Sequence, residues 1–124
     1  MIKVILDTNF LVYCAEQKID YKELIEELIN EGHELVVPEQ VMGELKEMSE
    51  KSEKLSDRTA AKLALKLLEH NKVSVAKAEG KYADEAVISL GKGNIVATHD
   101  VALKKRLRNS RRIIITGNKK LAFE

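Results

Sequence analysis

The chain has 124 residues, 44% of them hydrophobic and 33% charged, which suits one folded domain and excludes both a second full domain and a disordered chain. Its one cysteine excludes an internal disulfide and a cysteine-cluster metal site, and no apolar run approaches the roughly 20 residues that a membrane span needs. The formal net charge of +1 indicates no charged partner by itself, and the N-terminus lacks the pattern of a secretory signal, so we expect a cytoplasmic protein that does not enter a membrane.

Short β-branched runs alternate with longer stretches of helical periodicity along the chain. In chain order they predict a strand at 2–6, helices at 9–16 and 21–31, a strand at 34–37, a helix at 38–48, a helix that begins at Ser56 or Asp57, a strand at 73–76, a helix at 81–90, a strand at 94–98, a helix at 101–109 and a strand at 112–116. Strands that alternate with helices form parallel sheets covered on both faces. We therefore expect one α/β domain over residues 1–124, a three-layer sandwich around a central, mostly parallel, five-stranded sheet.

The two halves of the chain carry opposite charge. Residues 1–62 have a net charge of −6, and residues 63–124 have a net charge of +7. Much of the positive charge lies at 104–112, where six of nine residues are Lys or Arg. Such a cluster is typical of a surface that binds phosphate groups, although a solvated helix face has the same composition. The candidate phosphate-binding residues are Lys104, Lys105, Arg106, Arg108, Arg111 and Arg112.

Acidic side chains fall near the carboxyl ends of the predicted strands, where open parallel sheets bind their ligands. Asp7 directly follows the first strand, and Asp100 follows the fourth. Glu44 flanks the apolar stripe of the helix after the second strand, and Asp84 lies in the first turn of the helix after the third. Glu85 points about 100° away from Asp84 and is the second choice there. We expect these four candidate carboxylates, Asp7, Glu44, Asp84 and Asp100, to converge on one pocket.

Carboxylates that converge repel one another unless they hold protons or bind a cation. A hard ion such as Mg²⁺ or Mn²⁺ prefers oxygen ligands, can lower the pKa of a bound water and can stabilise charge on a phosphodiester. The pattern therefore predicts metal-dependent hydrolysis of a phosphate ester, with Thr8, Asn9 and Thr98 as polar neighbours that orient the carboxylates. Taken singly, each acid has a simpler interpretation as a helix N-cap, a first-turn acid or a solvated side chain.

Four segments, VILDTNFLVY, PEQVMGEL, KYADEAVISL and IVATHDVALKKRLR, together resemble the PIN domain, a family of metal-dependent ribonucleases. The resemblance covers essentially the whole chain. It implies a PIN-like fold and cleavage of single-stranded RNA with Mg²⁺ or Mn²⁺ held by three or four acids. The positions that match the family's catalytic and metal-binding acids are Asp7, Glu44, Asp84 and Asp100, and those that match its supporting residues are Asn9 and Thr98.

The C-terminal half is most similar to the branch of the family that processes ribosomal RNA and belongs to the small-subunit processome. PIN toxins commonly have a second acid two residues after the position of Asp100, and Ala102 stands there. The resemblance thus implies an endoribonuclease that hydrolyses RNA phosphodiester bonds, in ribosomal RNA processing. It implies single-stranded or ribosomal RNA as the main partner and leaves a homodimer and ribosome-assembly proteins open as further partners.

Two alternatives stay open at this point: a PIN scaffold that binds RNA or protein without cutting, and a toxin-type PIN ribonuclease. A phosphotransfer domain fits less well. Asn9 stands where a haloacid-dehalogenase-like phosphatase has its second aspartate, and the paired acid of a response-regulator receiver is missing.

Overall fold

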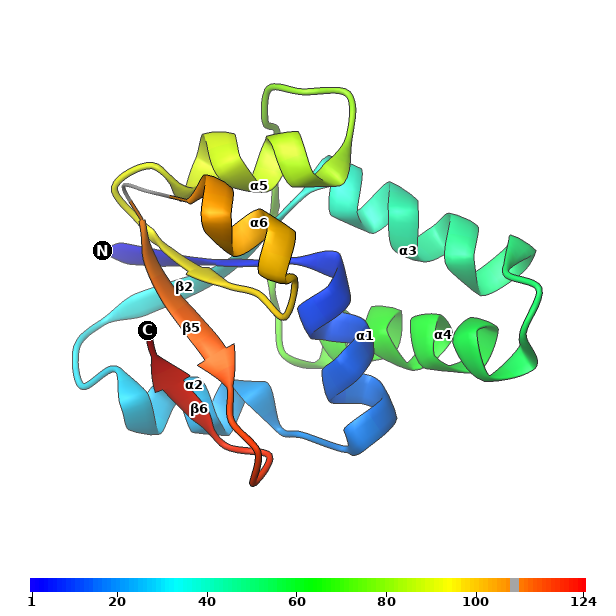
Figure 1. Cartoon of the computed structure of the whole chain (residues 1–124), viewed down its shortest axis with the longest axis horizontal. Coiled ribbons are helices and arrows are strands. Elements are labelled where there is room, and N and C mark those ends of the chain that lie inside the picture. Colours follow the sequence, from blue (N-terminus) through cyan, green and yellow to red (C-terminus); the bar gives the residue numbers. More distant parts are fainter. Residues whose placement is uncertain (108–109) are drawn as a thin grey trace.

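One six-stranded sheet organises the computed structural model, which describes residues 1–107 and 110–124 (Figure 1). The strand order is β3-β2-β1-β4-β5-β6. The elements along the chain are β1 (Ile2–Leu6), α1 (Thr8–Gln17), α2 (Tyr21–Leu28), β2 (His33–Pro38), α3 (Glu39–Lys51), α4 (Leu55–His70), β3 (Ser74–Ala76), α5 (Ala83–Gly91), β4 (Ile95–Ala97), α6 (Val101–Arg106), β5 (Arg111–Ile115) and β6 (Leu121–Phe123).

The five strands β1 to β5 are parallel, and β1 lies in the middle of the sheet between β2 and β4. Val4, Ile5 and Leu6 of β1 have no exposed surface, because helices cover both faces of the central strands. Figure 1 shows α5 and α6 on one side of the sheet and α2 on the other. The predicted α/β sandwich with a mostly parallel sheet is confirmed.

The sheet has a sixth strand that the sequence analysis did not predict. The antiparallel strand β6 pairs with β5 in the register Ile113 with Phe123 and Ile115 with Leu121. The intervening residues 116–120 form the turn, in which the Thr116 N–H donates to the Lys120 carbonyl at 2.8 Å. A Gly-Asn pair between two short apolar runs is a hairpin signal, so the expected count of five strands is corrected to six.

Several helices end at different residues from those predicted. The second predicted helix, 21–31, stops at Leu28. The helix predicted at 38–48 continues as α3 to Lys51, and α4 begins at Leu55 rather than at Ser56 or Asp57. The last predicted helix, 101–109, ends at Arg106, and its residues 108–109 lie outside the described part of the chain. In residues 1–107 and 110–124 every helix is too short or too polar to span a lipid bilayer.

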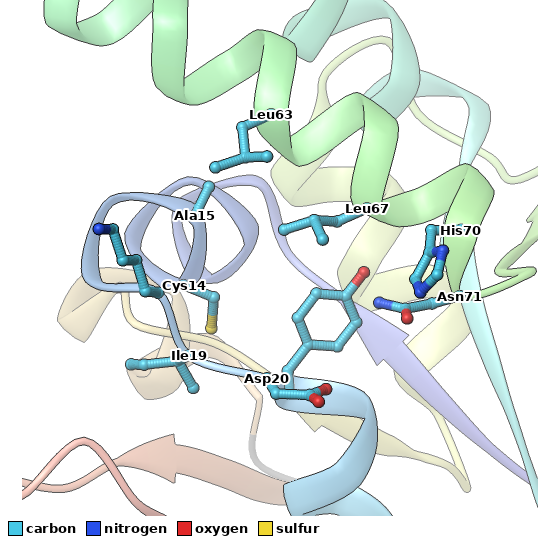
Figure 2. A pocket seen from close by; sticks show the side chains of 10 residues that line it. Cys14, Ala15, Ile19, Asp20, Leu63, Leu67, His70 and Asn71 are labelled. Carbon is cyan, nitrogen blue, oxygen red and sulfur yellow. The ribbon is translucent and has the colours of Figure 1, made fainter.

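Helices α3 and α4 form a hairpin that extends beyond the carboxyl edge of the sheet, and α1 packs against α4 (Figure 1). Between α1 and α4 lies a groove of about 330 Å³, into which Leu63 and Leu67 project from α4 (Figure 2). Cys14 of α1 lines this groove, and burial raises the pKa of its thiol to about 12. The thiol therefore stays protonated at neutral pH, as expected of a cysteine buried in the core.

Two helical glycines give a matched test of how tightly α5 packs on the sheet. A Cβ added to Gly91 at the end of α5 would lie 2.6 Å from Val96 Cγ2, whereas a Cβ added to Gly43 of α3 would meet no described atom within 4 Å. We expect Gly91→Ala to lower the free energy of unfolding by about 1–3 kcal/mol through overpacking. Gly43→Ala should raise it by about 0.5–1 kcal/mol, because alanine restricts the unfolded chain. Urea denaturation checks both changes, and an unchanged midpoint for Gly91→Ala would contradict the packing.

Candidate active site

Asp7 and Asp100 are joined through one threonine. The register of β1 and β4 pairs Leu6 with Ala97 and continues past the strands, where the Asp7 N–H donates to the Ala97 carbonyl at 3.1 Å. Asp7 therefore lies beside Thr98, whose Oγ1 donates to Asp7 Oδ2 at 3.1 Å and accepts from the Asp100 N–H at 3.1 Å. Asp7 and Thr98 are both buried, with 5% and 0% of their surface exposed. The parallel sheet thus brings two acids that lie 93 residues apart in sequence to one buried hydroxyl.

The two aspartates differ in how far local structure explains them. Asp100 caps α6, because its Oδ1 accepts from the Leu103 N–H at 3.2 Å, while its Oδ2 accepts from Asn9 Nδ2 at 3.4 Å. Asp7 occupies the N-cap position of α1, but its carboxylate makes no capping hydrogen bond to the first turn of that helix, all of which the structure describes. The simple N-cap interpretation therefore applies to Asp100 and fails for Asp7.

Glu44 and Asp84 are placed near each other by the packing of α3 against α5. In the first turn of α3, Gln40 Nε2 donates to the carbonyls of Ala78 and Gly80, at 2.8 and 2.7 Å. These bonds attach the segment before α5 to the start of α3, one helical turn before Glu44. Glu44 and Asp84 are close enough for the charge of Asp84 to raise the pKa of Glu44.

Asp84 is engaged by a basic residue from α6. Its Oδ2 lies 2.8 Å from Arg106 Nη1, and its Oδ1 accepts from the Glu85 N–H at 2.9 Å. Glu85 itself is exposed, whereas Asp84 is half-buried. The structure therefore places Asp84 rather than Glu85 toward the other acids and balances its charge with Arg106.

The ionisation of Asp7 and of Glu44 is affected by the charges of other candidate carboxylates. Burial raises the pKa of Asp7 to about 6, and the charges of Asp100 and Glu44 add to the rise, while the Thr98 hydroxyl and the Thr8 backbone oppose it. Glu44 is exposed as a residue, yet partial loss of hydration raises its pKa, and the charges of nearby Asp84 and Glu47 add to the rise. The Thr8 hydroxyl, which makes no hydrogen bond within the described residues, lies near enough to Glu44 to oppose the rise.

The four side chains have the chemistry that a hard divalent cation prefers, but their positions satisfy the geometry of a metal site only in part. All four candidate groups are carboxylates, which Mg²⁺ and Mn²⁺ prefer, and a buried carboxylate with a raised pKa is a group that a cation would stabilise. Within the described residues, however, no three His, Cys, Asp or Glu side chains converge closely enough to hold a metal. The structure brings the four to one edge of the sheet without assembling them around one point, and the Arg106 contact accounts for the position of Asp84.

The predicted phosphate-binding residues have several internal partners. Lys104 Nζ and Arg112 Nε lie 3.5 and 3.4 Å from the Glu124 carboxylate, and the Arg111 guanidinium lies 4.2 Å from the centre of the Phe123 ring. Lys105 is exposed. The sixth candidate, Arg108, lies outside the described residues.

A surface hollow of about 330 Å³ brings part of this basic cluster together. Its lining residues are Val101, Lys104, Lys105, Arg112 and Glu124. Val101 directly follows Asp100, so the hollow begins next to one of the candidate carboxylates.

The roles of Glu124 and Arg106 as internal counterions were missed by sequence reasoning. Glu124 is the one acid among the last 24 residues, which was the available signal for its pairing with Lys104 and Arg112. No such signal exists for Arg106, because its contact with Asp84 depends on how α6 packs beside α5.

Comparison with known proteins places this arrangement in a family. Residues 4–120 match the family described as a PIN like domain. The chain is 33% identical to Ribonuclease VapC4 of Methanocaldococcus jannaschii over 128 aligned positions, which cover 100% of this chain and 96% of that protein.

Solved structures agree with this result. The structure of the PIN domain endonuclease Utp24 superposes with a TM-score of 0.77 and 27% identity over 98% of this chain and 90% of that one. VapBC2 from Rickettsia felis, solved with a DNA fragment from its promoter, shares the fold alone, with a TM-score of 0.52 and 15% identity over 90% of this chain and 98% of that one. The chain belongs to the PIN-like domain family, among relatives that are named ribonuclease and endonuclease.

Proposed function

We propose that the chain is a divalent-metal-dependent endoribonuclease whose four candidate carboxylates hold Mg²⁺ or Mn²⁺. The observation that carries the proposal is the buried Asp7 carboxylate, which α1 does not use as a cap and which Thr98 links to Asp100. Burying an acid among other acids destabilises a fold unless a cation compensates, so this arrangement is typical of a functional site. The names of the relatives support RNA as the substrate.

Each residue of the site has a distinct task in this proposal. Asp7 and Asp100 supply the central cation ligands, and Thr98 fixes their carboxylates through its hydroxyl. Asn9 orients the Asp100 oxygen that is not used in capping α6. A divalent cation bound there would lower the pKa of a water molecule and stabilise negative charge on the phosphodiester.

Glu44 and Asp84 complete the proposed site from the α3 and α5 side. In this proposal Arg106 releases Asp84 when a cation binds, and Arg106 is then free to contact a phosphate group. The cation would then face the Asp84 carboxylate, and Arg106 would face the negative charge of the RNA. The contact is exposed on both sides, so separating the two groups requires little free energy.

A role in ribosomal RNA processing is the finer proposal. It rests on the resemblance of the C-terminal half to that branch of the family and on the similarity to Utp24 over 98% of the chain. The similarity to VapC4 keeps the toxin-type ribonuclease as the second candidate.

Asp7→Asn should abolish cleavage, with a loss of at least about 100-fold in the rate at saturating Mn²⁺, because it removes a buried anionic ligand. The measurement is cleavage of fluorescently labelled single-stranded RNA. Glu50→Gln is the matched control, since Glu50 is an exposed acid on the same helix as Glu44 but is not one of the four carboxylates. Cleavage by Asp7→Asn at the wild-type rate would overturn the assignment of the site.

A measurement of the stability of Asp7→Asn distinguishes a loss of activity from a loss of fold. The pKa of Asp7 is about 6 in the folded chain against 3.8 as its reference value, so the folded state binds the proton more tightly. Stability from this group is therefore present below about pH 4 and falls by up to about 3 kcal/mol as the pH rises through 6. In chelator at pH 7, Asp7→Asn should be more stable than wild type and should show a flatter pH profile. A variant that is less stable at pH 7 would contradict this.

Calorimetric titration with Mn²⁺ separates the nuclease from a non-cleaving scaffold. Wild type should bind the ion, and Asp7→Asn or Asp100→Asn should weaken binding by at least about 10-fold. Glu50→Gln should bind as wild type does. The absence of measurable Mn²⁺ binding to wild type would favour the scaffold.

RNA binding should depend on the basic hollow and on Glu124. In the Asp7→Asn background, Lys105→Ala should weaken binding and reduce the slope of log affinity against log salt by about 0.7, as for one lost phosphate contact. Glu124→Gln should strengthen binding, because it frees Lys104 and Arg112. Lys62→Ala, an exposed lysine of α4, is the control. A salt titration that gives equal slopes for all variants would remove the hollow from the binding surface.

A further inference from the structure

A stacked pair of rings lies at the edge of the candidate active site. The rings of Tyr13 and His99 have centroids 4.2 Å apart and planes inclined by 29°. Tyr13 belongs to α1, and His99 lies in the segment between β4 and α6. None of the roles proposed above uses either side chain.

Both rings belong to segments that also carry residues of the candidate active site. His99 stands between Thr98, whose hydroxyl donates to Asp7, and Asp100, whose N–H donates to the same hydroxyl. Tyr13 follows Asn9 by one helical turn, and Asn9 donates to Asp100. A ligand on this ring pair would therefore lie next to whatever the carboxylates bind.

The exposure of the two rings gives the pair a free side. Tyr13 is half-buried, whereas His99 is exposed although Tyr13 covers one of its faces. The accessible surface of the imidazole is therefore its other face and its edges. By contrast, Phe10 and Tyr21 are buried in the core, where they contact each other edge to face.

Single-stranded RNA is recognised mainly by stacking its unpaired bases on aromatic or histidine rings. A base and its phosphate are separated by one sugar, so a base that stacks on His99 belongs to a nucleotide that flanks the phosphate at the carboxylates. We propose that the outer face of His99, supported by Tyr13, binds an unpaired nucleobase next to the scissile phosphate. This inference rests on the proposed function, whose substrate is RNA.

The test measures RNA affinity in the Asp7→Asn background, which binds without cutting. His99→Ala should weaken binding of a single-stranded oligonucleotide by between about 5- and 150-fold, the range for one lost stacking contact. His99→Phe should keep most of the affinity, because a phenyl ring stacks without carrying charge. His70→Ala is the matched control, since His70 is also an exposed histidine but lines the groove between α1 and α4 (Figure 2).

A scan with abasic nucleotides identifies the contact itself. One abasic position in the oligonucleotide should weaken binding to the Asp7→Asn protein, and the same position should have no effect once His99→Ala is added. A role of His99 in structure alone would leave that position equally important in both proteins. We expect His99→Ala to unfold at the same temperature as its parent, which would show that its loss of affinity is not caused by a loss of fold.

The outcomes separate this inference from the proposed function. Equal affinity of His99→Ala and its parent, or a loss in His99→Phe as large as in His99→Ala, would overturn base stacking while cleavage of RNA by wild type stands. If RNA neither binds nor is cleaved, the proposed function and the stacking site fall together.

Discussion

The register between β1 and β4 is the constraint on which the site depends. Because Leu6 pairs with Ala97, the next residues on the two strands, Asp7 and Thr98, lie side by side where the sheet ends. A shift by one residue would turn Asp7 to the other face of the sheet and separate it from Thr98. The buried apolar residues of the two strands fix this register, so the core determines the position of the acid.

The same core creates the electrostatic problem that the site solves. Asp7 is almost fully buried, and its pKa is about 6 mainly because burial removes the water that would stabilise the charged form, while the charges of Asp100 and Glu44 add to the rise. Elsewhere the protein neutralises charged side chains with salt bridges: Arg106 pairs with Asp84, and Glu124 pairs with Lys104 and Arg112. Asp7 has no such partner within the described residues, which is why a cation from solution is the natural complement in our proposal.

The fold and the position of the acids followed from the sequence because both depend on local pattern and on topology. Alternating strands and helices predict a parallel sheet, and a parallel sheet carries Asp7 and Asp100 to one edge whatever the details of packing. The sixth strand was missed because Leu121–Phe123 is three residues long and pairs with β5 only across the turn.

Side-chain partners were harder to predict than elements. The contact of Arg106 with Asp84 depends on the placement of α6 beside α5, and the stack of His99 on Tyr13 depends on where α1 leaves the sheet. The direction of each acid is equally a matter of packing, so the sequence led us to expect four carboxylates in one pocket, whereas among the described residues they reach one edge of the sheet without meeting at one point.

The charge asymmetry of the sequence gains a structural meaning from the short helix α6. The acidic half of the chain provides Asp7 and Glu44, and the basic half provides Asp84 and Asp100 together with the lysines and arginines that follow. Asp100 caps α6 while Lys104, Lys105 and Arg106 occupy its last turn, where cations also interact favourably with the helix dipole. One helix of six residues therefore holds an acid of the proposed metal site at one end and residues suited to phosphate at the other. A substrate that spans α6 would need negative charge at regular spacing, which is a property of a polynucleotide backbone and not of a small phosphate ester.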